Sequence, residues 1–67
     1  MYIVTIGHTK GKKYLYITNN SLAGVQWTWK HTFKDATRFK TYIEAKDAMR
    51  LVVHHDQISD ATIYGYM

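Results

Sequence analysis

Hydrophobic and polar residues alternate over three stretches in the first half of the chain. These stretches are Tyr2–Ile6, Lys13–Thr18 and Val25–Lys30. A period of two is typical of strands that bury one face. In the second stretch we expect Leu15 and Ile17 to face the core. Tyr14 and Tyr16 then lie on the opposite face. The pattern therefore predicts three strands.

Turn-forming residues separate these strands. Gly7–Gly11 carries glycine at both ends and predicts a hairpin loop. Asn19–Ser21 has the composition of a turn, and Gly24 is expected to close that second loop. In the strand that follows, Val25, Trp27 and Trp29 share one face, and we expect the two tryptophans in the core.

The hydrophobic period changes near Thr41. Thr41 with Glu44 three residues later matches a capping box, so we expect a helix from Tyr42 to about His54. Its buried stripe consists of small and apolar residues at helical spacing: Ala45, Ala48, Met49 and Val52, flanked by Tyr42 and Val53. Ile43 and Leu51 fall outside that stripe, so apolar side chains are expected on the solvent side.

Two shorter pieces complete the prediction. Phe33 is expected to anchor a turn, followed by a short extended piece, Thr37–Phe39, with Phe39 pointing inward. Ala61–Tyr66 is β-rich and predicts a last strand, which we place centrally, beside the first. The expected fold is a single α+β domain over residues 1–67. It has a small antiparallel sheet of three to five strands and one helix packed on one face.

The residues around the helix start carry a resemblance to a known group of proteins. They are Trp29 and the segment Ala-x-x-Phe-x-Thr-x-x-Glu-Ala, here Ala36, Phe39, Thr41, Glu44 and Ala45. This spacing resembles that of very small proteins from phages and prophages of low-GC Gram-positive bacteria, and the resemblance covers most of the chain. It implies two opening strands, a Trp strand, a helix and a closing strand. Where such phage proteins have known functions, they are often inhibitors of host enzymes or of host immunity.

Charge is distributed unevenly along the chain. Nine basic and five acidic residues give a net charge of +4, and no acid precedes Asp35. This asymmetry predicts a positive surface on the N-terminal sheet, suited to an acidic partner or a phosphate backbone. The alternative is a solvated surface that only keeps a small protein in solution.

Composition also limits the protein's location and chemistry. The chain has no cysteine, which excludes disulfides and thiolate metal sites. Met1 leads directly into a strand pattern without a signal peptide, and the longest apolar run, Leu51–Val53, is too short to cross a membrane. We therefore expect a soluble protein in the cytoplasm of a bacterial host cell, without membrane association.

Candidate catalytic and metal-binding residues are few. His54 and His55 are adjacent and diverge by about 100° on a helix, so they cannot chelate one ion together. His8 and His31 fall in predicted loops, and neither serine of the chain has a nucleophile-elbow context. We expect no catalytic residue, no metal and no cofactor, and hence a protein that is not an enzyme.

Binding to another macromolecule is the remaining class of function. A one-helix sheet leaves one face uncovered, and aromatic and basic residues are favoured at interface centres. The hypothesis is a phage-encoded inhibitor that masks a surface of a bacterial defence or nucleic-acid-handling protein. The alternative is a single-stranded nucleic-acid-binding protein that uses a basic aromatic sheet face. The candidate partner-binding residues are Lys12, Lys13, Tyr14, Tyr16, Lys30, Ile43, Leu51, Tyr64 and Tyr66.

Self-association is part of the same hypothesis. A chain of 67 residues buries only about 60% of its unfolded surface, so its margin of stability is thin. A homodimer would bury further apolar surface and raise that margin. We therefore expect a homo-oligomer, most simply a dimer, in addition to a bacterial host protein as the partner.

Overall fold

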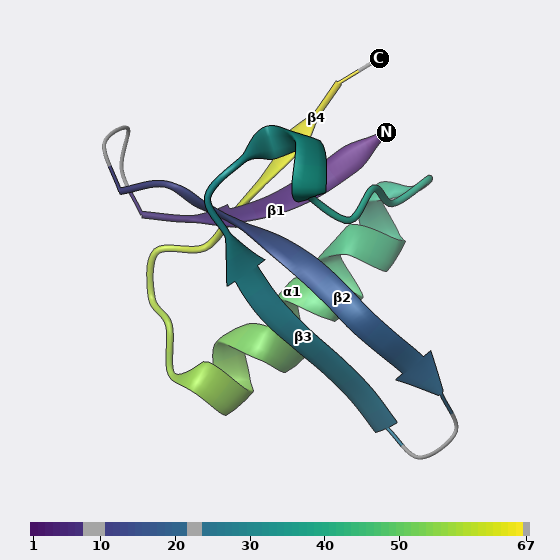
Figure 1. Ribbon diagram of the computed structural model, residues 1–67. Helices are drawn as coiled ribbons and strands as arrows, with labels where there is room; N and C mark the ends of the chain where they lie inside the picture. Colours follow the sequence, from purple (N-terminus) through teal and green to yellow (C-terminus); the bar gives the residue numbers. More distant parts are fainter. Residues whose placement is uncertain (8–10, 22–23, 67) are drawn as a thin grey trace.

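The computed structural model describes residues 1–7, 11–21 and 24–66, and it has one sheet and one α-helix (Figure 1). The sheet is antiparallel, with its four strands in the order β3-β2-β1-β4. This architecture confirms the predicted α+β fold. The elements are β1 (Tyr2–Ile6), β2 (Lys13–Ser21), β3 (Gly24–Lys30), the 3₁₀ turn η1 (Phe33–Asp35), α1 (Tyr42–Asp56) and β4 (Thr62–Gly65).

The last strand lies beside the first, as expected, but at the edge of the sheet and not at its centre. Tyr2 is opposite Gly65, and Thr5 is opposite Thr62. The two chain ends meet because the Met1 amino group donates to the Tyr66 carbonyl oxygen at 2.7 Å, and Tyr66 N–H donates to the Met1 carbonyl at 2.7 Å. β1 is therefore held on both sides, and β4 forms one edge of the sheet.

The second strand is longer than predicted. Asn19–Ser21 was expected to be a turn, but it continues β2 and pairs with Gly24–Gln26 of β3. The prediction was wrong because Thr18 is an extra residue in β2, a bulge that shifts the register after Ile17 and lets pairing continue. The predicted loop Gly7–Gly11 lies largely outside the described residues.

A short segment fills the gap where β1 and β2 diverge (Figure 1). These strands pair only at Thr5 with Tyr14 and at Ile6 with Lys13. Beyond that point Thr37 takes the place of a β1 residue: its N–H donates to the Leu15 carbonyl at 2.9 Å, and its Oγ1 accepts from Ile17 N–H at 2.8 Å. The extended piece predicted at Thr37–Phe39 thus completes the hydrogen bonding of β2.

The helix begins where the capping pattern placed it and ends later than predicted. Thr41 Oγ1 accepts a hydrogen bond from Glu44 N–H at 3.1 Å. The helix continues through His54 to Asp56 and ends at Gln57, whose φ of 56° is left-handed and whose N–H donates to the Val53 carbonyl. At this end the Asp56 carboxylate accepts hydrogen bonds from side chains of β3, which hold the last turn of the helix against the sheet.

Removal of the helix cap gives the first test. Thr41→Ala leaves the Glu44 N–H without its acceptor, and we expect unfolding to become easier by about 1 kcal/mol. The measurement is the free energy of unfolding in urea. Thr41→Ser keeps the hydroxyl and should restore most of the loss; equal losses in both variants would contradict a capping role.

The core lies between α1 and the sheet. Its buried side chains are Val4, Leu15, Phe39, Ala45 and Val52. Partly buried Trp27, Trp29 and Met49 pack around them, among others. Ala45 is fully buried, so its small side chain lets the helix approach the sheet closely. The predicted buried stripe of the helix is confirmed at its centre, whereas Tyr42 is 49% exposed and packs edge-on against Tyr2.

Candidate functional site

The sheet face opposite α1 presents aromatic rings to solvent. Strand register places Ile3 beside Tyr64, Thr5 beside Tyr14, and Tyr16 beside Thr28 on this face. Tyr16 is 38% exposed and Tyr64 is 45% exposed. Both rings project from strands, so hydrogen bonding of the sheet fixes their spacing.

Each exposed ring of this face is paired with a cation. Lys30 Nζ lies 5.5 Å from the centre of the Tyr16 ring, and Lys12 Nζ lies 4.6 Å from the centre of the Tyr64 ring. At these distances a ring attracts a cation by about 0.5–1 kcal/mol at an exposed site. A third pair, Arg38 over Phe33, lies beside them at 5.6 Å. We call the surface formed by Lys12, Tyr16, Lys30, Phe33, Arg38 and Tyr64 the aromatic–basic face.

Part of this side of the sheet is covered by the chain itself. The expectation of a fully bare face is wrong where β1 crosses it, because Ile3 and Thr5 are 3% and 2% exposed. η1 packs there: the Phe33 ring lies 6.1 Å from the Tyr14 ring and 5.3 Å from the Tyr66 ring. In Figure 1, η1 lies in front of β1 and α1 lies behind the sheet. The open part of the face is therefore limited to its rim and to β2 and β3.

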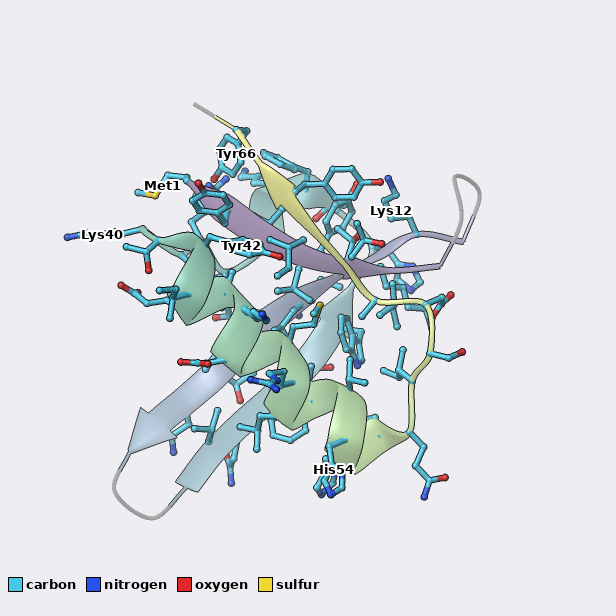
Figure 2. The ribbon with its side chains drawn as sticks, turned by 180° about the vertical axis from the view of Figure 1, so that it is seen from behind. Met1, Lys12, Lys40, Tyr42, His54 and Tyr66 are labelled. Carbon is cyan, nitrogen blue, oxygen red and sulfur yellow. The ribbon has the colours of Figure 1, made fainter. Side chains whose placement is uncertain are left out.

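The nine predicted binding residues do not form one surface. Tyr14 and Tyr66 are half-buried against Phe33, and the Tyr66 hydroxyl is buried without a hydrogen-bond partner among the described residues. Lys13 alternates onto the other side of the sheet, opposite Ile6. Ile43 and Leu51 lie on α1, which is seen in front of the sheet in Figure 2. The remaining four, Lys12, Tyr16, Lys30 and Tyr64, belong to the aromatic–basic face.

Acidic residues also occur near this face: η1, which packs on it, ends at Asp35, and Asp60 lies at the rim. A hollow beside Tyr64 is lined by Gly7, Lys12, Asp60 and Thr62, among others. The Asp60 Oδ2 accepts a hydrogen bond from Gly7 N–H at 3.0 Å, so this carboxylate is engaged in holding the loop between α1 and β4. At the centre of the face, Tyr16 and Thr28 are exposed and Lys30 is half-buried.

A second cluster, at the outer edge of β3, was not found from the sequence. The indole N–H groups of Trp27 and Trp29 donate to Asp56 Oδ2 at 3.0 and 3.3 Å, and His55 Nδ1 lies 3.0 Å from Asp56 Oδ1. The hydrogen bond from Trp27 is the largest of the causes that lower the pKa of Asp56, and the contact with His55 adds to it. We call Trp27, Trp29, His55 and Asp56 the indole–carboxylate cluster.

This cluster fastens the end of α1 to β3. Alternation correctly placed both tryptophans on the helix side of β3, but it carries no information on where their N–H groups point. Two donors in β3 at spacing i, i+2 and one carboxylate at a helix end were visible in the sequence. Their pairing depends on how α1 crosses the sheet, which only the folded structure shows.

Metal-ligating side chains do not gather in the described part of the chain. Among residues 1–7, 11–21 and 24–66, no three histidine, cysteine or acidic side chains come together where an ion could be held. His54 projects from the end of α1 (Figure 2), and His8 lies outside the described residues. Within the same ranges, no helix is long and apolar enough to cross a membrane.

Comparison of the chain with protein-family models, with curated proteins and with solved structures finds no match.

Proposed function

We propose that this protein is a non-enzymatic binding protein that covers an acidic surface of another protein with its aromatic–basic face. The observation that carries the proposal is the pairing of rings and cations: Tyr16 with Lys30, Tyr64 with Lys12, and Phe33 with Arg38. Tyrosine and arginine are enriched where binding energy concentrates at interfaces. The adjacent cations supply attraction for carboxylates and speed the encounter.

The mechanism of such a protein is steric and electrostatic. Tyr16 and Lys30 project from neighbouring paired strands, so little conformational freedom of the backbone is lost on binding. A partner surface covered in this way is closed to its other ligands. No group of the face has to react.

The biological setting of the proposal is a phage-encoded inhibitor in a bacterial cell. It rests on the resemblance of the segment from Ala36 to Ala45 to small phage proteins, together with the basic charge of the face. Defence nucleases and other nucleic-acid enzymes are proposed as targets, because a basic protein can cover an acidic regulatory or catalytic surface of such an enzyme.

Self-association belongs to this proposal. β3 lies at one edge of the sheet, with β2 as its partner on the inner side. Pairing of two chains at such an edge would extend the sheet and leave the aromatic–basic face open. Sedimentation velocity over a range of concentrations tests this proposal, and we expect a dimer to form as the concentration rises. A protein that stays monomeric at the highest concentration would reject the dimer.

A second candidate function is binding of single-stranded nucleic acid. Exposed tyrosines on a sheet with lysines nearby can stack bases and pair with phosphates. The geometry favours the protein partner, because Lys30 and Lys12 already lie over the faces of Tyr16 and Tyr64 on which a base would stack. A base would have to displace each cation first.

Photo-crosslinking in a bacterial lysate tests the two functions against each other. A benzophenone amino acid in place of Tyr16 should crosslink to one protein in stoichiometric amounts, and the same group in place of Tyr42, an exposed aromatic residue of α1, should not. Once that protein is identified, Tyr16→Ala and Lys30→Ala together should weaken its affinity by about tenfold or more. The matched control is Ile43→Ala with Lys46→Ala, which removes one apolar side chain and one cation from the helix.

Titration with labelled oligothymidine at two salt concentrations completes the test. Little binding is expected at moderate salt, since the face offers few phosphate contacts. Tight oligothymidine binding that Tyr16→Ala abolishes would replace the protein-binding proposal with the nucleic-acid one. Equal crosslinking from positions 16 and 42 would reject the assignment of the face.

A further inference from the structure

An apolar groove lies on the other side of the sheet, between α1 and the outer parts of β2 and β3. Figure 1 shows the β2–β3 hairpin extending past α1, so the helix covers only part of it. Leu51 on the helix side of the groove is 47% exposed, although it is apolar. We call this surface the acid-rimmed groove; its lining residues are Ile17, Val25, Phe39, Glu44, Asp47, Ala48 and Leu51.

The short side chain of Ala48 leaves the groove open. Ala48 is short, so it leaves space between α1 and the partly exposed Ile17 and Val25. Phe39 forms the floor and is only 9% exposed, because its ring packs in the core; two backbone hydrogen bonds of 2.8 Å with Tyr2 fix its position. The walls and floor therefore belong to paired strands and a capped helix, which hold the shape of the groove without a ligand.

The charged residues that line the groove are both acidic. The carboxylates of Glu44 and Asp47 form its rim, and neither has an ion pair with the described residues. Arg50 neighbours Asp47 at spacing i, i+3 on the surface of α1 but does not line the groove, and Lys46 lies about 100° from Asp47 around the helix. The stretch from Tyr14 to Trp29, which includes the strand residues Ile17 and Val25 of the groove, contains no charged residue. An acidic groove on a chain of net charge +4 is a local reversal of the overall charge.

A second copy of the chain fits this surface poorly. Ile43, Asp47 and Leu51 follow one another at spacing i, i+4 along α1. Two such helices packed symmetrically about Asp47 would set one aspartate against the other, which is repulsive. A ligand of this groove therefore needs positive charge beside the rim and apolar side chains against the floor.

We infer that the acid-rimmed groove binds a short amphipathic segment of a partner protein, with apolar residues against Leu51 and Ile17 and with lysine or arginine beside Glu44 and Asp47. This site goes beyond the proposed function, since it lies across the sheet from the aromatic–basic face and selects the opposite charge. Amphipathic segments that lie in apolar grooves are a recurring mode of peptide recognition. One chain could then hold two protein surfaces at once.

A pair of synthetic peptides tests the groove. The probe is a fluorescent peptide built from repeats of Leu-Lys-Lys-Leu, and its counterpart carries glutamate in place of lysine. We expect the lysine peptide to bind in fluorescence anisotropy and the glutamate peptide not to bind. Non-specific attraction cannot produce this order, because the whole chain is positive and repels the lysine peptide.

Matched variants locate the binding. The double variant Glu44→Gln, Asp47→Asn should bind the lysine peptide with about tenfold lower affinity. Asp35→Asn with Asp60→Asn raises the net charge by the same amount away from the groove and should leave the affinity unchanged. Leu51→Ser should weaken binding, and Tyr42→Ser, at a similarly exposed residue of α1 that does not line the groove, should not. Equal affinity of the two double variants for the lysine peptide would overturn the inference. Unchanged binding by the Leu51→Ser variant, shown to be folded by circular dichroism, would overturn it as well.

Discussion

Leu15→Ala is expected to destabilise the protein by about 2–5 kcal/mol, the largest effect of any single truncation proposed for this chain. Leu15 is fully buried between α1 and the sheet, in the same cluster as Val4 and Val52. Its removal loses the transfer free energy of the side chain and leaves a cavity, because the paired strands around it cannot collapse. A domain of 67 residues has a total stability of only about 3–10 kcal/mol.

A urea unfolding curve measures this loss, with the tryptophan fluorescence of Trp27 and Trp29 as the signal. Leu51→Ala is the matched control: the same atoms are removed from a side chain that is 47% exposed, so a cost below about 1 kcal/mol is expected. Similar losses in the two variants would mean that Leu15 is not at the centre of the core.

Asp56→Ala is expected to have the second largest effect, a loss of about 1–3 kcal/mol. The carboxylate accepts from both indole N–H groups, and its removal leaves Trp27 and Trp29 without an acceptor. The lower end of the range applies if water replaces it, since the Asp56 side chain is 30% exposed. Release of the helix end should also shift the fluorescence of both tryptophans. Asp47→Ala, an acid of the same helix without such bonds, is the control.

The same carboxylate gives the protein a defined dependence on pH. Hydrogen bonds from Trp27 and the contact with His55 lower the pKa of Asp56 in the folded state. Its contribution is therefore fully present above the unfolded value of about 3.9, and it is lost as the pH falls through the lower folded value. Stability measured from pH 7 downward should decline more steeply in the wild type than in Asp56→Asn, which keeps an acceptor oxygen and does not titrate. Parallel declines would contradict the assignment.

Local patterns were enough to predict most of the secondary structure. Thr41 and Glu44 placed the start of the helix, because a cap depends on residues three apart in the chain. Alternation placed Leu15 and the two tryptophans on the helix side of the sheet, because the side-chain period of a strand is a property of the backbone. The end of β2 was wrong, since the bulge at Thr18 is stabilised by pairing with β3 and leaves no mark in composition.

The candidate site was only partly predicted, because each of its surfaces joins elements distant in sequence. Lys12 and Tyr64 were both named as binding residues, but their contact exists only because β4 returns beside β1. The cover of η1 over Tyr14 depends on the path of the chain after β3. The acid-rimmed groove likewise requires the extended β2–β3 hairpin to project past α1.

By itself the sequence determined the fold class, the helix start, the buried stripe and the excess of positive charge, all of which follow from short-range periodicity and composition. The tertiary structure decided which side chains of separate elements meet: Asp56 with two indoles, the lysines with tyrosine rings, and Leu51 with the open end of the hairpin. The physical reason is that hydrogen bonds and charges act over a few ångströms in space, whereas the sequence orders residues only along the chain.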